Sequence, residues 1–99
     1  MRHLVAIALM LLPFPAAAQS AADGRPLAER WCMACHVIER ESPTLAPDRG
    51  PSFTTIAARP STTPEYLRRH LSTSHTHMPD FALSRYESDA LIAYILSLR

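Results

Sequence analysis

The chain has 99 residues, ten of them arginine and none lysine, nine acidic residues and a formal net charge of +1. This length predicts one small domain, and the balanced charge without a basic run excludes a typical nucleic-acid-binding module. A mature domain of about 80 residues has only a marginal apolar core and usually needs a covalent or cofactor-based staple.

The N-terminal stretch predicts a secretory signal peptide over residues 1–18, followed by the mature domain over residues 19–99. Arg2 and His3 begin it, an unbroken apolar run covers residues 4–12, and small residues end it at Ala18. Cleavage after Ala22 would also fit. The apolar run is too short for a membrane span, which takes about 20 residues. Export would place a bacterial domain in the periplasm, an oxidising compartment.

A first helix is expected from Asp23 to about Cys35. Asp23 suits the N-cap position, and Pro26 is tolerated in the first turn of a helix. An apolar stripe at helical spacing is formed by Leu27, Ala28 and Trp31. We expect the indole of Trp31 to pack in the core.

Cys32, Cys35 and His36 form a C-x-x-C-H run, which is typical of covalent haem attachment. Two thiols at this spacing can form thioethers with the two vinyl groups on one edge of a porphyrin. The histidine directly after them can then bind the iron axially. The alternatives are a thioredoxin-type disulfide and half of a zinc site. Neither a βαβ pattern nor a second pair of cysteines accompanies the run.

The middle of the chain predicts a loop and two short helices. Residues 37–50 are rich in proline, glycine and mixed charges, as in a loop. Ser52 then caps a short helix over residues 52–59, which a proline stops. A third helix over residues 63–71 begins with Pro64 at its first position.

The polar loop over residues 72–83 carries a second chemical candidate, Met78. A thioether is a soft, neutral sixth ligand that raises the reduction potential of a low-spin haem. Met33 lies inside the attachment run and cannot reach round the ring. The alternative ligands are two histidines of the same loop, His75 and His77. His70 in the third helix is expected to be a half-buried packing residue.

The last helix is expected to begin at the capping box formed by Ser84 and Glu87. Its apolar face recurs at helical spacing at Leu91, Tyr94, Ile95 and Leu98. This face should pack across the first helix and along one side of the haem, with Tyr94 as a packing aromatic.

Together these landmarks resemble the class I (mitochondrial-type) cytochrome c family, in particular its small bacterial periplasmic monohaem members. The resemblance rests on Gly24 in the first helix, CMACH at 32–36, GPSF at 50–53, HMP at 77–79 and LIAYI at 91–95. It implies an all-α fold of about four short helices wrapped around one covalently attached haem c. It also implies that Gly24 allows a close crossing with Tyr94.

The resemblance also implies roles for individual residues. The implied thioether sites are Cys32 and Cys35, and the implied iron ligands are His36 and Met78. A proximal histidine normally donates its second ring N–H to a fixed acceptor. The implied acceptor is the carbonyl of Pro51.

The function implied by the resemblance is electron transfer rather than catalysis. The protein would pass single electrons from a donor dehydrogenase or cytochrome complex to an acceptor oxidase or reductase. It would bind neither nucleic acid nor a small-molecule substrate, and would be a monomer or a small subunit of a redox complex. The alternatives are an open-site haem enzyme or a gas or peroxide sensor, if Met78 does not bind iron, and a thiol–disulfide module without haem. Lysine-guided docking is not expected, since lysine is absent; arginines and an apolar patch would serve instead.

Overall fold

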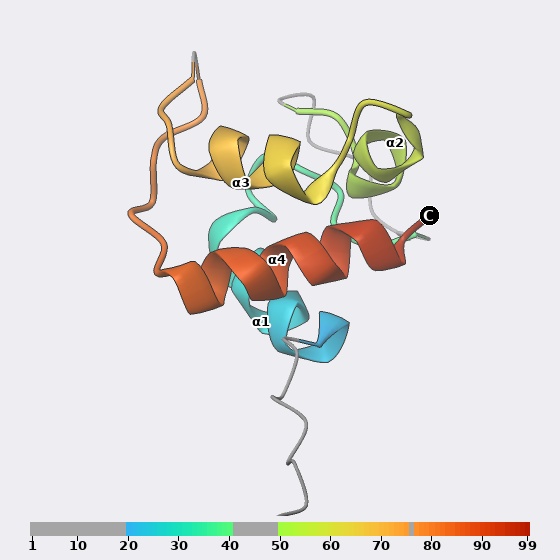
Figure 1. Ribbon diagram of the computed structural model, residues 1–99, viewed down its shortest axis with the longest axis horizontal. Helices are drawn as coiled ribbons and strands as arrows, with labels where there is room; N and C mark the ends of the chain where they lie inside the picture. The colour runs from blue at the N-terminus through green and yellow to red at the C-terminus, as the bar shows by residue number, and fades with distance from the viewer. Residues whose placement is uncertain (1–19, 41–49, 76) are drawn as a thin grey trace, which may run out of the picture.

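The computed structural model describes residues 20–40, 50–75 and 77–99. Its helices are α1 (Ala21–Trp31), α2 (Phe53–Ala58), α3 (Pro64–Leu71) and α4 (Arg85–Ser97). α4 lies across the middle of the molecule, with α1 on one side and α2 and α3 on the other (Figure 1). The expectation of an all-α fold is confirmed. The predicted signal peptide and most of the predicted loop over residues 37–50 fall outside the described residues.

The prediction that α1 begins at an Asp23 N-cap is wrong, because Ser20 caps the helix. The Ser20 Oγ accepts a hydrogen bond from the Asp23 N–H at 3.3 Å, and Asp23 Oδ2 accepts one from the Ser20 N–H at 3.2 Å. Asp23 is therefore the third residue of the helix and completes a reciprocal capping box with Ser20. As a result Pro26 lies inside the helix rather than in its first turn, and it has no N–H to donate to the preceding turn.

The prediction that α1 extends to Cys35 is also wrong. The helix ends at Trp31, with Cys32 as its C-cap. The backbone N–H groups of Cys35 and His36 both donate to the carbonyl of Cys32, at 3.1 and 2.9 Å. These bonds fold the C-x-x-C-H run into a compact turn that follows the helix.

The other three helices begin where the sequence predicts. Ser52 and Thr63 cap α2 and α3, and Pro64 is the first residue of α3. Ser84 and Glu87 form the expected capping box at the start of α4. These starts depend on contacts within one turn of helix, and local sequence therefore determines them.

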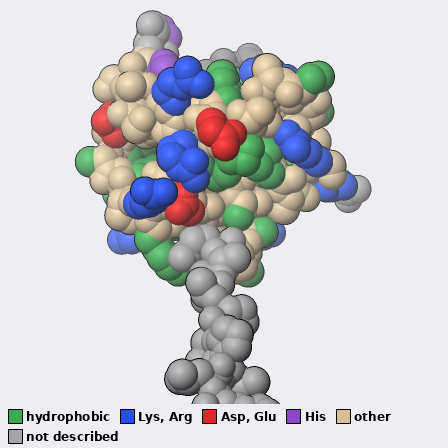
Figure 2. Space-filling model, in the orientation of Figure 1, with side chains coloured by type: hydrophobic (Ala, Val, Ile, Leu, Met, Phe, Trp, Pro, Cys, Tyr) green, Lys and Arg blue, Asp and Glu red, His purple; other side chains and the backbone are tan. Residues whose placement is uncertain are grey.

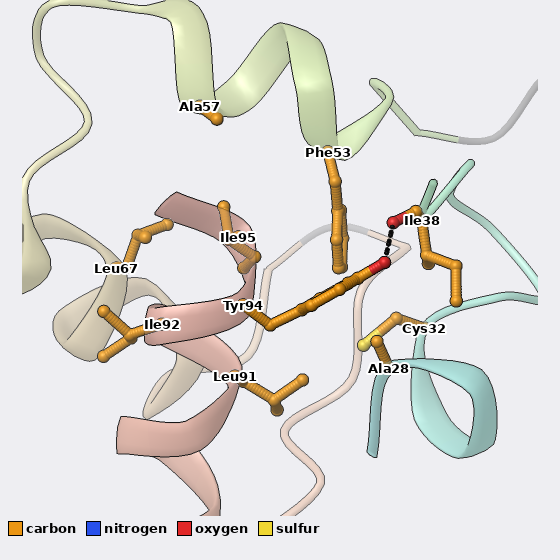
Figure 3. Packing of buried hydrophobic residues seen from close by; sticks show 10 residues of the cluster. All are labelled: Ala28, Cys32, Ile38, Phe53, Ala57, Leu67, Leu91, Ile92, Tyr94 and Ile95. Atoms are coloured by element: carbon orange, nitrogen blue, oxygen red, sulfur yellow. Dashed lines mark hydrogen bonds between the residues drawn. The ribbon is translucent and has the colours of Figure 1, made fainter. Parts of the chain in front are cut away.

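The crossing of α1 and α4 depends on Gly24. A Cβ atom on this residue would lie 2.0 Å from the carbonyl oxygen of Ala90 and 2.7 Å from the Cβ of Tyr94. Any larger residue would force the helices apart. The Tyr94 hydroxyl donates a buried hydrogen bond of 2.7 Å to the carbonyl of Ile38 (Figure 3). Both the close crossing and the packing role of Tyr94 are confirmed.

The core is small and α4 supplies much of it. Figure 3 shows its buried members, which come from all four helices and from the chain after α1: Ala28, Cys32, Ile38, Phe53, Ala57, Leu67, Leu91, Ile92, Tyr94 and Ile95. The expectation that Trp31 packs in this core is wrong. Its side chain is 36% exposed, because it lies at the last residue of α1 and faces a cavity instead.

The surface carries charges of both signs close together. On the face in Figure 2, arginines lie beside acidic residues rather than in a patch of one sign. Arg68 of α3, for example, pairs with Asp89 of α4 at 2.8 Å. Among the helices of the described residues, none is long and apolar enough to cross a bilayer.

Candidate functional site

One cavity is lined by all five residues that the family resemblance implies for haem attachment, iron ligation and support of the proximal histidine. It measures about 260 Å³, and its wall includes Cys32, Cys35, His36, Pro51 and Met78. Much of the remaining wall is aliphatic and comes from α2, α3 and α4: Ile56, Leu67, Leu71, Leu91 and Ile95. A space with apolar walls and a few donor atoms suits a large apolar ligand that is anchored at fixed points.

The ring of His36 is held by a hydrogen bond to Pro51. Its Nδ1 lies 2.6 Å from the Pro51 carbonyl oxygen. A carbonyl can only accept, so Nδ1 carries the proton and donates it. The Nε2 atom then keeps its lone pair, which is the state that a metal ligand requires. The contact implied by the family resemblance is therefore present.

The residues around Pro51 complete a cradle for the same ring. A Cβ atom on Gly50 would lie 2.6 Å from Cε1 of His36, so only glycine leaves room for the imidazole. The ring of Phe53 packs against His36, with their centroids 5.4 Å apart. The N–H of Phe53 also donates to the carbonyl of Val37 at 2.9 Å. Thus the GPSF run holds His36 through a carbonyl, a missing side chain and an aromatic ring.

The two cysteines of the attachment run differ in burial. Cys32 is buried and Cys35 is half-buried. Burial, followed by the neighbouring Cys35, raises the pKa of the Cys32 thiol to about 11. The neutral form is therefore favoured at this position. A thioether is also neutral, so attachment to a porphyrin places no charge in the buried site.

Met78 lies beside a group of stacked side chains. Its side chain is half-buried, and its backbone pairs with that of His75. The ring of His75 stacks on that of His70, with centroids 3.8 Å apart and an angle of 12°. Burial, then His75 and His36, lowers the pKa of His70. His70 is half-buried, as predicted, whereas His75 and His77 are exposed while also lining the cavity.

Sequence reasoning missed an aromatic pair on the cavity wall. Trp31 and Phe81 both line the cavity, and their ring centroids lie 5.3 Å apart. The guanidinium of Arg30 lies 5.5 Å from the centroid of the Trp31 ring. The position of Trp31 directly before Cys32 is the one sequence signal that could have suggested this role.

The donor atoms around the cavity fit an iron porphyrin better than a bare metal ion. Within the described residues, no three His, Cys, Asp or Glu side chains form a group that could hold a metal ion. The cavity instead offers two thiols, a thioether and an imidazole with its Nε2 lone pair. Two thiols can hold the edge of a haem, while imidazole and thioether sulfur suit its iron.

Comparisons with known proteins point the same way. The family described as cytochrome c oxidase, cbb3-type, subunit III matches residues 19–95. The chain is 41% identical over 101 aligned residues to a cytochrome c-552 of Bradyrhizobium diazoefficiens, with 98% of this chain and 96% of that protein covered. No solved structure gives a significant match.

Proposed function

Because the chain belongs to the class I cytochrome c family and therefore carries one covalently attached haem c, we propose that it is an exported electron carrier with His36 and Met78 as iron ligands. An electron-transfer function with protein redox partners follows from the family. The ligands, the export and the shuttling role are the proposal.

The hydrogen bond from His36 to Pro51 carries the proposal for the proximal side. At 2.6 Å it fixes the tautomer and directs the ring, leaving Nε2 to bind iron. Cys32 and Cys35, which line the same cavity, would form the two thioethers.

The proposal for Met78 rests on its position and its chemistry. Its side chain lines the cavity that contains His36, whereas the side chain of Met33 is 56% exposed. A thioether favours ferrous iron and raises the potential. When bound, the haem supplies the one-electron chemistry by alternating between ferric and ferrous iron.

The protein's own residues would control how freely the electron moves. The Gly50 cradle holds His36 in one orientation, so the ligand need not rearrange when the charge of the iron changes. The apolar wall limits the access of water and lowers the local dielectric constant, which tunes the potential. These are the properties of a carrier, and we propose that the protein is not an enzyme.

We also propose that residues 1–18 are a signal peptide and that the mature domain functions in the periplasm. The family match begins at residue 19, directly after the predicted cleavage point. The apolar run before it has the length of a signal-peptide core rather than that of a membrane span.

The proposed partners are a donor dehydrogenase or cytochrome complex and an acceptor oxidase or reductase. The matched family is named for an oxidase subunit, which favours an oxidase as the acceptor. The proposed state is a monomer or a small subunit of such a complex, with no small-molecule substrate and no nucleic acid.

The experiment is to express the exported protein, extract loose haem with acidified organic solvent and record spectra. Haem that survives extraction indicates thioethers at Cys32 and Cys35. We expect the ferric protein to show the weak long-wavelength iron–sulfur band, and Met78→Ala to remove it. The matched control is Met33→Ala, which should retain the band. Wild-type protein that retains haem but lacks the band, and binds carbon monoxide when reduced, would instead support an open-site enzyme or sensor.

A further inference from the structure

We propose that His75 is a positioning residue for the distal ligand: it ties the backbone of Met78 to the C-terminal end of α3 and does not itself bind the iron. This inference rests on the proposed ligation of iron by Met78. It assigns a role to one of the two histidines that compete with Met78 as candidate ligands.

The first link joins His75 to Met78 through the backbone. The N–H of His75 donates to the carbonyl of Met78 at 2.9 Å, and the N–H of Met78 donates to the carbonyl of His75 at 3.0 Å. A reciprocal pair of this kind fixes the two residues opposite each other. Wherever the ring of His75 is anchored, the backbone of Met78 is therefore anchored as well.

The second link joins the ring of His75 to α3. The ring stacks on His70, with centroids 3.8 Å apart and planes at 12°. Its Nε2 lies 3.1 Å from the carbonyl oxygen of His70 and 3.2 Å from Thr73 Oγ1. The Thr73 hydroxyl in turn donates to the carbonyl of Arg69 at 3.0 Å. One imidazole thus contacts both the side chain and the backbone at the end of α3.

The same geometry disfavours Nε2 of His75 as an iron ligand and leaves only Nδ1 with a lone pair. The carbonyl of His70 can only accept, so Nε2 of His75 must carry a proton to bond with it. A protonated ring nitrogen has no lone pair to offer iron. The ring would have to leave both His70 and Thr73 before its Nε2 could become a ligand.

The third link joins α3 to the core. Leu67 of α3 is buried in the core cluster, and Arg68 pairs with Asp89 of α4 at 2.8 Å. His70 is half-buried, and its ring also stacks with Tyr66 at 5.9 Å. The anchor for His75 is therefore a helix that packs on α4, and the position of Met78 is set by that packing.

His77 provides a matched control, because it directly precedes Met78. Its side chain is exposed and its backbone φ is 67°, in the left-handed region. Asparagine tolerates this conformation better than most residues. His77→Asn and His75→Asn therefore make the same chemical change two positions apart. Only His75→Asn removes the ring that contacts α3.

The experiment compares both variants with wild type as full-length, haem-loaded protein. We expect His75→Asn to increase the affinity of ferric protein for added imidazole about tenfold, equivalent to about 1.4 kcal/mol, because it removes an aromatic stack and a hydrogen bond. The iron–sulfur band should weaken in parallel. His77→Asn should change the imidazole affinity by a smaller factor than His75→Asn does. Urea unfolding of each variant measures any general loss of stability. Such a loss alone would leave the spectrum of the folded protein unchanged.

His75→Phe is a rescue variant, because phenylalanine can stack on His70 but cannot bind iron. We expect it to recover part of the wild-type resistance to imidazole and part of the band. If His75→Phe is as impaired as His75→Asn, or if His75→Asn behaves like His77→Asn, the inference about His75 is wrong. In that case an iron–sulfur band in the wild-type protein would still support Met78 as the ligand. A wild-type spectrum without that band would overturn both.

Discussion

The supports of His36 and Met78 differ in how deeply they are built into the protein. His36 is held by the backbone of Gly50 and Pro51 and by Phe53, which belongs to the buried core. The Met78 segment, defined as His75 and residues 77–81, is held by side chains outside the core cluster. Its contacts are those of His75 with α3 and of Phe81 with the exposed Trp31.

This difference separates two tasks. Backbone atoms of Gly50 and Pro51 and the core ring of Phe53 fix the ligand that stays with the covalently attached haem, and changing them should cost stability. Contacts outside the core cluster hold the second ligand, and changing them should alter the iron–sulfur bond while the fold persists. Regions held mainly by exposed contacts open more readily than buried ones. Variants of residues in the two regions test this division.

Gly50→Ala should have the largest effect. Gly50 does not have a positive φ, so the cost comes from the new Cβ, which would lie 2.6 Å from the His36 ring. We expect the free energy of unfolding to fall by about 3 kcal/mol, at the upper end for overpacking, and the yield of holoprotein to fall with it. Pro79→Ala, in the exposed part of the Met78 segment, should stay within about 0.5 kcal/mol. Equal values for the two variants in urea unfolding would contradict the division.

Tyr94→Phe should have an intermediate effect that is confined to stability. It removes the buried 2.7 Å hydrogen bond to Ile38 and leaves that carbonyl without its partner. The expected loss is about 1.5 kcal/mol in urea unfolding, with the iron–sulfur band unchanged. Tyr86→Phe is the control, since Tyr86 is 55% exposed. A weaker iron–sulfur band in Tyr94→Phe would show that the core also holds Met78.

Trp31→Leu and Phe81→Leu should act mainly on the Met78 segment. Their rings lie 5.3 Å apart on the cavity wall, and such a pair contributes about 1 kcal/mol beyond its burial. A double-mutant cycle on imidazole affinity should therefore give a coupling of about 1 kcal/mol. Tyr86→Leu paired with Phe81→Leu should give no coupling. Additive effects of the first pair would mean that the contact does not hold the segment.

Ala82→Gly should have the smallest effect, and it should stabilise. Ala82 has a φ of 52°, and the left-handed region costs a residue with a Cβ about 1–2 kcal/mol. Glycine removes that cost but loses about 0.4–1 kcal/mol through the entropy of the unfolded chain. A net gain of about 0.5 kcal/mol in urea unfolding is expected. A loss of similar size would show that the backbone is not strained at Ala82.

Local sequence was sufficient to predict the features that depend on contacts within one turn of helix. The caps at Ser52, Thr63 and Ser84 were predicted correctly for this reason. The start of α1 was misplaced because Ser20 and Asp23 can both cap a helix, and only their reciprocal hydrogen bonds show which one does. The C-x-x-C-H run was readable because its spacing reflects the chemistry of attachment.

Contacts between distant parts of the chain could not be predicted from local sequence patterns. The predicted contact between His36 and Pro51 draws its weight from the family resemblance, because an isolated Gly-Pro predicts only a turn. The apolar stripe of the first helix predicts a core position for Trp31. The prediction is wrong because an apolar residue on such a stripe can equally face a cavity. The stack of His75 on His70 depends on how the chain returns after α3, which no helical periodicity encodes.

The most direct test of the whole account is a redox titration of the wild-type holoprotein, followed by absorption spectroscopy. We expect one reversible transition with a slope of about 59 mV per decade, as for one electron, with the iron–sulfur band present in the ferric form and lost on reduction. A ferric protein that never shows this band, together with ready binding of carbon monoxide after reduction, would contradict His36 and Met78 as the two ligands of an electron carrier.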